Sequence, residues 1–134
     1  MPLADKQNTL IDDLNLIEYP HERLAALTSY VPMTLLPEEL KSDALIVPGC
    51  VSRVWVLGTL EEGCTRFRCV ADSPMVASLV AVLCHLYSGE TPAEVVSIEP
   101  EVWTRCGFNK MLSPTRMNGL AAVRQRIKKL AGKW

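Results

Sequence analysis

The fold is decided by residues 45–71, which read LIVPGCVSRVWVLGTLEEGCTRFRCVA. β-Branched and aromatic residues dominate this stretch, and such residues are typical of strands. Pro48 and Gly49 interrupt it with a tight bend, because proline cannot donate to a strand ladder and glycine tolerates turn geometry. Residues 61–63, Glu-Glu-Gly, predict a hairpin turn. We therefore expect a small antiparallel sheet of about three strands.

Helices are predicted both before and after this sheet in the sequence. Apolar residues recur at helical spacing in residues 7–17 and 21–30, and a further helical turn is expected after Pro37. Three helix start signals follow the sheet, at Ser73-Pro74, at Thr91-Pro92-Ala93-Glu94 and at Ser113-Pro114. The order of helices, sheet and helices indicates an α+β fold.

Two of these helices have informative patterns. The helix after Ser73 is apolar nearly all round, which predicts burial at the centre of the domain. The helix after Ser113 has one apolar stripe, and its basic residues lie elsewhere, so one side is expected to pack and the other to face water. The stripe is formed by Leu120, Val123, Ile127 and Leu130, and the basic residues are Arg124, Arg126, Lys128 and Lys129.

Length and composition predict one domain, residues 1–134, because a 134-residue chain with 49% hydrophobic residues can form a core. The net charge of −1 provides no overall field that attracts nucleic acid or an anionic membrane, so neither is an expected partner. Acidic residues near the N-terminus argue against a signal peptide. The uncharged residues 73–89 are too few to span a bilayer. We expect a cytoplasmic protein.

Five cysteines occur at positions 50, 64, 69, 84 and 106. The odd count and the lack of a Cys-x-x-Cys pair argue against a disulfide framework and a zinc knuckle. Free thiols are therefore expected, with no metal and no cofactor. The two histidines, His21 and His85, are isolated and are interpreted as surface or core residues.

Cys50 is the candidate nucleophile. It follows the Pro48-Gly49 bend, where the lack of a side chain on Gly49 lets a partner approach the sulfur. A cysteine attacks as its thiolate, and Arg53 or Arg116 is a candidate cation for lowering its pKa. The alternative is an inert buried cysteine, since free cysteines often act as small hydrophobic residues.

The segment Gly49-Cys50-Val51-Ser52-Arg53-Val54-Trp55 resembles the Gly-Cys-x-Ser-x-Val-Trp signature of the SufE family of sulfur acceptors. Further blocks resemble the family in the same order, over the chain from about residue 37 to residue 129. They are Ala71-Asp72-Ser73, the apolar helix after it, Gly89-Glu90-Thr91-Pro92, Leu112-Ser113-Pro114-Thr115-Arg116 and Asn118-Gly119-Leu120. The chain departs from the family pattern at Pro74, at Ser78 and at Cys106-Gly107-Phe108, which affects the fit to partners.

The resemblance implies that the α+β fold is of SufE/IscU-like type. It also implies that Cys50 receives sulfur from the persulfide of a pyridoxal-phosphate cysteine desulfurase, stimulates that enzyme and delivers the sulfur to an iron–sulfur scaffold complex. It places Arg116 near the cysteine loop, where it contacts the partner; an exposed residue in a first helical turn is the alternative. Asp72 either polarises the site or favours the start of the next helix, and we prefer the helix start. Trp55 is interpreted as a packing residue.

The expected chemistry is thiol exchange, in which Cys50 attacks the outer sulfur of the donor persulfide. We expect the Cys50 loop to be partly sheltered in the free protein, with Val51 and Trp55 near the sulfur, and extended when docked. This is a carrier rather than a stand-alone enzyme. Two alternatives remain open: a desulfurase regulator that carries no sulfur, and a metal or cluster scaffold. The scaffold would combine Cys50 with some of Cys64, Cys69, Cys106, Asp72 and His85.

Overall fold

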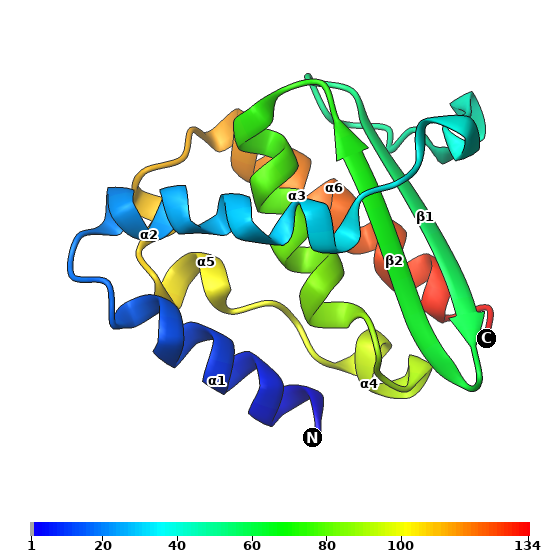
Figure 1. Ribbon diagram of the computed structural model, residues 1–134, viewed down its shortest axis with the longest axis horizontal. Coiled ribbons are helices and arrows are strands. Elements are labelled where there is room, and N and C mark those ends of the chain that lie inside the picture. The colour runs from blue at the N-terminus through cyan, green and yellow to red at the C-terminus, as the bar shows by residue number, and fades with distance from the viewer. Residues whose placement is uncertain (1) are drawn as a thin grey trace.

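The computed structural model describes residues 2–134 and shows an α+β fold. In these residues six α-helices pack with a two-stranded antiparallel sheet, which lies along one side of the molecule (Figure 1). The helices are α1 (Leu3–Asn15), α2 (Pro20–Ala26), α3 (Pro74–Tyr87), α4 (Pro92–Ser97), α5 (Val102–Arg105) and α6 (Pro114–Ala131). The strands are β1 (Val54–Glu61) and β2 (Cys64–Ala71). Short 3-10 turns are η1 (Leu27–Tyr30), η2 (Pro32–Thr34), η3 (Glu38–Leu40), η4 (Asp43–Leu45) and η5 (Phe108–Lys110).

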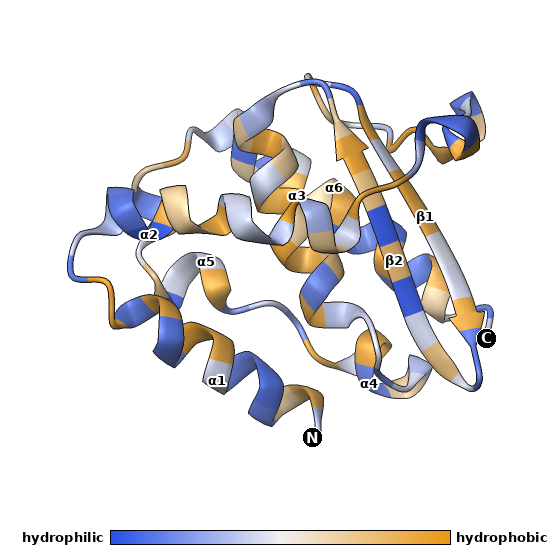
Figure 2. Ribbon diagram, in the orientation of Figure 1, coloured by the Kyte–Doolittle hydropathy of each residue, from blue (hydrophilic) through white to orange (hydrophobic). Residues whose placement is uncertain are grey.

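The predicted hairpin is present. β1 and β2 pair over their full length, and Glu62 and Gly63 form the turn with φ angles of 53° and 81°. Two consecutive residues with positive φ match the twist of the flanking strands, which is why such turns are favoured in hairpins. Burial alternates along β2, where the buried Phe67 lies between Arg66 and Arg68, and the buried Cys69 follows. Hydrophilic and hydrophobic bands along this strand are visible in Figure 2.

The sheet has two strands, where about three were expected. The segment expected as the third strand contacts β1 through one bridge, at Ile46, and through a hydrogen bond from the Val47 N–H to the Val54 carbonyl at 2.8 Å. Pro48 follows at once and has no N–H to continue the ladder. At the opposite edge Leu35 makes a single parallel bridge to β2. Both flanking segments therefore touch the sheet without extending it.

Helix α3 lies at the centre of the molecule, between the sheet and the N-terminal helices (Figure 1). Its residues 78–84 are all buried, as are Leu86 and Tyr87. This confirms the burial that its apolar sequence predicts. The helix begins at Pro74, where the Ser73 hydroxyl accepts a hydrogen bond from the backbone N–H three residues later.

Helix α6 has the predicted apolar stripe, but Arg124 does not face water as expected. This side chain is 4% exposed and its Nη2 atom lies 2.7 Å from Oε2 of Glu99. Its guanidinium carbon lies 4.6 Å from the centre of the Tyr87 ring. The stripe pattern missed this arrangement because a buried arginine needs partners from other segments, and those partners are not visible in the periodicity of α6.

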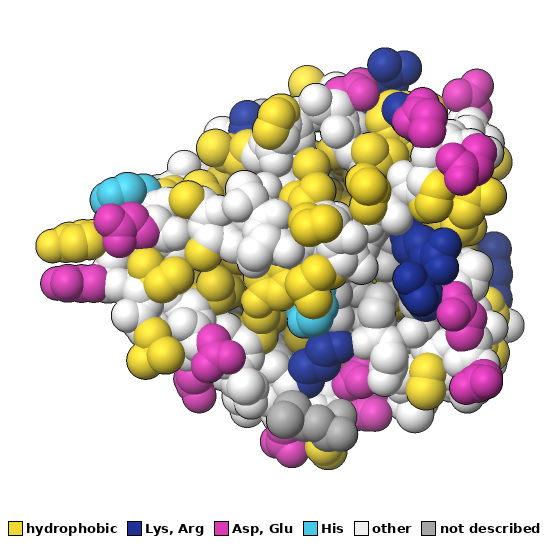
Figure 3. Space-filling view, viewed as in Figure 1, with side chains coloured by type: hydrophobic (Ala, Val, Ile, Leu, Met, Phe, Trp, Pro, Cys, Tyr) yellow, Lys and Arg dark blue, Asp and Glu magenta, His cyan; other side chains and the backbone are white. Residues whose placement is uncertain are grey.

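The N-terminal helices confirm the two predicted helical stretches, with shifted ends. α1 begins at Leu3, and α2 ends at Ala26 and continues as the 3-10 turn η1. The four-residue helix α5 was not predicted, because it is too short to show helical periodicity. None of the helices in residues 2–134 is long and apolar enough to cross a membrane. The face in Figure 3 mixes acidic and basic side chains.

Candidate active site

Cys50 lies in the bend between η4 and β1, and residues 46–53 of this bend are called the Cys50 loop. The bend depends on Gly49, whose φ of 92° lies in the left-handed region that favours glycine. A Cβ atom at this position would lie 3.3 Å from the Cβ of Ala122 on α6, so the bend also packs closely against that helix. The local sequence Pro-Gly-Cys therefore turns the chain and places the thiol against α6.

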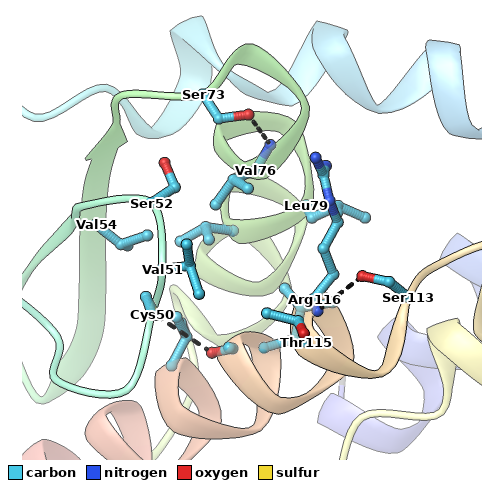
Figure 4. A pocket seen from close by; sticks show the side chains of 14 residues that line it. Cys50, Val51, Ser52, Val54, Ser73, Val76, Leu79, Ser113, Thr115 and Arg116 are labelled. Carbon is cyan, nitrogen blue, oxygen red and sulfur yellow. Dashed lines mark hydrogen bonds between the residues drawn. The ribbon is translucent and has the colours of Figure 1, made fainter.

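The Cys50 thiol opens onto a pocket of about 250 Å³. The pocket is bounded by the Cys50 loop, the start of β1, the first turns of α3 and the first turns of α6 (Figure 4). Its walls are mainly apolar, with contributions from Val54, Val76, Leu79, Leu120 and Val123. Ser73 and Ser113, which cap α3 and α6, also line it, so the N-termini of two long helices meet at this pocket.

The thiol itself is half-buried. Its Sγ atom donates a hydrogen bond to the Gly119 carbonyl at 3.5 Å, and burial raises the pKa of Cys50 above its ordinary value. A raised pKa means that the free protein holds Cys50 as the protonated thiol at neutral pH. The expectation that a neighbouring arginine lowers this pKa is therefore wrong for the free protein, because burial dominates.

Arg53 and Asp72 form an ion pair with each other instead of acting on the thiol. Nε of Arg53 donates to Oδ2 of Asp72 at 2.7 Å, and both side chains are substantially exposed. Neither residue lines the pocket. The cap of α3 is Ser73, and Asp72 is the residue before it. The carboxylate and the backbone N–H of Asp72 both bond to Arg53, which connects the Cys50 loop to the end of β2.

Arg116 lies inside the pocket with Cys50. Figure 4 shows the two side chains on opposite sides of the pocket, with Arg116 extending from the first turn of α6 toward the start of α3. Its backbone N–H donates to the Ser113 hydroxyl at 3.2 Å. Its Nη1 atom is buried and has no hydrogen-bond partner among the described residues. The alternative of an ordinary exposed residue in a first helical turn is therefore wrong.

Val51 and Trp55 do not both lie near the sulfur as expected. Val51 lines the pocket but is 87% exposed, at the tip of the loop. Trp55 points to the other face of the sheet, since its neighbours Val54 and Val56 face the core, and Lys41 Nζ lies 4.0 Å from its ring centre. Trp55 is thus a packing residue, as interpreted from the sequence.

The other four cysteines do not join the site. Cys64 is exposed at the hairpin turn, whereas Cys69, Cys84 and Cys106 are buried. Residues 2–134 contain no group of three or more His, Cys, Asp or Glu side chains that is placed to hold a metal ion. The ligand set that the scaffold alternative requires is therefore not assembled in the described part of the chain.

Sequence reasoning missed the residues that form the pocket walls, above all Val76, Leu79 and Thr115. It identified Ser73 and Ser113 as helix starts through their Ser-Pro signals, but not as neighbours. Nothing in the local sequence shows that the two helices begin at the same place. Their proximity follows only from the way α3 and α6 pack on each other.

The chain is similar to known proteins over most of its length. The model of the SufE family, described as Fe-S metabolism associated domain, matches residues 8–131. An uncharacterized SufE-like protein of Synechocystis is 38% identical over 82 residues, which cover 61% of this chain and 52% of the relative. The sulfur acceptor protein CsdE of Escherichia coli is 35% identical over 94 residues, which cover 69% of this chain and 64% of CsdE. The chain thus spans about half to two thirds of these relatives.

A solved structure shares the fold. The solution structure of a hypothetical protein from Thermus thermophilus matches with a TM-score of 0.77 and 21% sequence identity, over 96% of this chain and 94% of that one. Because the family model covers nearly the whole chain, from the first helix to the last, this protein belongs to the SufE family.

Proposed function

We propose that this protein is a cytoplasmic sulfur acceptor, which takes a sulfur atom onto Cys50 from a pyridoxal-phosphate cysteine desulfurase. The observation that carries the proposal is the position of Cys50 at the tip of a bend, with its thiol half-buried in an apolar pocket. Such a thiol can leave the pocket by movement of a short loop. Membership of a family that includes a relative named sulfur acceptor protein supports the same function.

The transfer is a thiol–persulfide exchange. The Cys50 thiolate attacks the outer sulfur of the donor persulfide, a new bond forms between the two sulfurs, and the sulfur–sulfur bond of the donor breaks. The donor leaves as a thiolate and Cys50 becomes a persulfide. No external oxidant or reductant is consumed, because the donor persulfide already carries sulfur at the required oxidation level.

The raised pKa of Cys50 supports a mechanism in which the thiol is activated on docking. Inside the pocket burial favours the protonated thiol, so the free protein reacts slowly. When the loop extends toward the desulfurase, the thiol leaves its apolar surroundings and the Gly119 carbonyl. The cause of the raised pKa is then removed, and the thiolate forms where the donor persulfide is present.

The rim of the pocket is the proposed contact surface for the desulfurase. Val51, which lines the pocket, is 87% exposed, and Met75, in the first turn of α3, is 43% exposed. The exposed Arg53–Asp72 ion pair adjoins the Cys50 loop and adds a polar contact. Arg116 is half-buried in the free protein, and movement of the loop would make it more accessible to a partner. After release, the persulfide is delivered to an iron–sulfur scaffold complex.

The test measures cysteine turnover by a cysteine desulfurase with and without this protein. We expect the wild-type protein to increase the rate of alanine formation, because it removes the persulfide that blocks the next cycle. Cys50→Ser is expected to abolish the increase, and Cys64→Ser, which removes an exposed thiol from the hairpin, is expected to preserve it. If Cys50→Ser still stimulates the enzyme, the protein is a regulator that carries no sulfur.

A further inference from the structure

Arg116 is the charged residue of the pocket. The other residues that line the pocket are neutral, and no carboxylate lies among them. The Nη1 atom of Arg116 is buried and has no hydrogen-bond partner in residues 2–134. A buried unpaired donor on a guanidinium is costly, since nearly all buried polar groups in folded proteins are hydrogen-bonded. The free protein therefore holds a cationic donor that is ready for an anion.

The first turns of two helices strengthen the positive character of the pocket. α3 and α6 have 14 and 18 residues, and the serines that cap their N-termini both line the pocket. The N-terminus of a helix carries partial positive charge, which stabilises a nearby anion. The apolar walls exclude water and strengthen this interaction, because charges interact more strongly at low dielectric.

The Cys50 thiol does not use this positive charge. It rests as the protonated form and donates its hydrogen to the Gly119 carbonyl. A persulfide differs in two ways, because it extends one sulfur atom further and its terminal S–H is more acidic than a thiol. Once ionised it has no hydrogen to donate to Gly119, and it requires a donor instead. The pocket, at about 250 Å³, has room for the added sulfur.

We propose that Arg116 is a positioning residue that pairs with the Cys50 persulfide anion and retains it in the pocket between sulfur uptake and delivery. The proposal rests on the proposed function and adds a resting place for the cargo. The thiol form is held by the Gly119 carbonyl, and the persulfide form is held by the Arg116 guanidinium. Sulfur uptake thus changes which group anchors the loop, and the loaded carrier is protected from small thiols until a partner draws the loop out.

The experiment loads Cys50 without any desulfurase, in a Cys64→Ser parent that lacks the exposed second thiol. Cys50 is first converted to a mixed disulfide with thionitrobenzoate. Hydrosulfide then attacks the Cys50 sulfur, displaces thionitrobenzoate and leaves the Cys50 persulfide. Glutathione is added, its thiolate removes the outer sulfur as glutathione persulfide, and intact mass spectrometry follows the loss of one sulfur atom with time.

We expect Arg116→Gln to lose the sulfur about tenfold faster than the parent, which corresponds to about 1.4 kcal/mol. Arg116→Lys, which keeps the charge, is expected to restore most of the retention. Arg66→Gln, on the hairpin beside Glu61, is the matched control and is expected to match the parent. Circular dichroism and the thermal midpoint verify that each variant is folded, and Arg116→Lys still tests the proposal if Arg116→Gln does not fold.

A second readout separates persulfide retention from simple closure of the loop. Alkylation of the unloaded Cys50 thiol by iodoacetamide reports how often the loop opens. We expect Arg116→Gln to change this rate by less than about threefold, because the thiol is held by Gly119. Equal sulfur loss from Arg116→Gln and the parent, or an equal acceleration of alkylation and sulfur loss, contradicts the proposal. Since loading is chemical, failure of the desulfurase to transfer sulfur does not affect this test.

Discussion

Cys50 is a potential nucleophile whose surroundings in the free protein lower its reactivity. Its thiol is half-buried, its pKa is raised by burial, and a single hydrogen bond of 3.5 Å holds it to Gly119. A carrier that circulates among small oxidants and thiols benefits from this combination, because the thiolate is the reactive form. The weak anchoring lets a docked partner extract the loop at low cost.

Gly49 offers a test of how the bend presents this thiol. Gly49→Ala is expected to destabilise the protein by about 1–2 kcal/mol, because the left-handed conformation disfavours a Cβ atom, and to add a clash with the Ala122 methyl group. Gly63→Ala is the matched control, since Gly63 also has positive φ but has no atom within 4 Å of the added Cβ. Urea unfolding measures both changes.

The contact with Ala122 is what distinguishes Gly49→Ala from Gly63→Ala. If the bend packs against α6 as described, Gly49→Ala loses more stability than Gly63→Ala and also exposes Cys50 to faster alkylation by iodoacetamide. Equal loss of stability, with no change in alkylation at Cys50, would show that contact with α6 does not hold the bend.

At the scale of elements, local signals in the sequence were sufficient to place most helices. Ser73, Thr91 and Ser113 each accept a hydrogen bond from the N–H three residues later, as the capping signals predict. The predicted third strand is absent from the sheet, because Pro48 has no N–H and ends the hydrogen bonding of this segment to β1 after one bridge. The burial of Arg124 was missed because it depends on Glu99 and Tyr87, which lie outside α6.

The Arg124–Glu99 pair, which ties α6 to the segment after α4, predicts a pH effect. The hydrogen bond from Arg124 lowers the pKa of Glu99. The pair therefore stabilises the fold above the ordinary glutamate pKa of about 4.3, and this stabilisation is lost as the pH falls through the lowered folded-state pKa. Because Glu99 is 57% exposed, Glu99→Gln is expected to remove about 0.5–1 kcal/mol at pH 7.

Unfolding in urea at pH 7 and at pH 3 measures this effect. The stability difference between the wild-type protein and Glu99→Gln is expected to shrink at pH 3, because this pH is below the ordinary glutamate pKa and the unfolded state then binds the proton more readily than the folded state. Glu39→Gln, on the exposed turn η3, is the control and is expected to show little difference at either pH. A difference for Glu99→Gln that stays constant or widens at pH 3 would argue against the ion pair.

At the scale of the whole molecule, the pocket joins segments that are far apart in the chain. The Cys50 loop, the start of α3 and the start of α6 meet only because α3 and α6 pack against the hairpin and against each other. Composition and periodicity contain no information about this meeting. The resemblance to the SufE family associated Cys50 with Arg116 before the structure did, although it assigned Arg116 to partner contact. The single-domain organisation stays a prediction.

The central claim, that Cys50 carries the sulfur, is tested most directly by intact mass spectrometry after incubation with a cysteine desulfurase and cysteine. The wild-type protein and Cys64→Ser are expected to gain one sulfur atom that reductant removes, and Cys50→Ser is expected to gain none. A gain of sulfur by Cys50→Ser, or no gain by the wild-type protein while the desulfurase turns over, would contradict the claim.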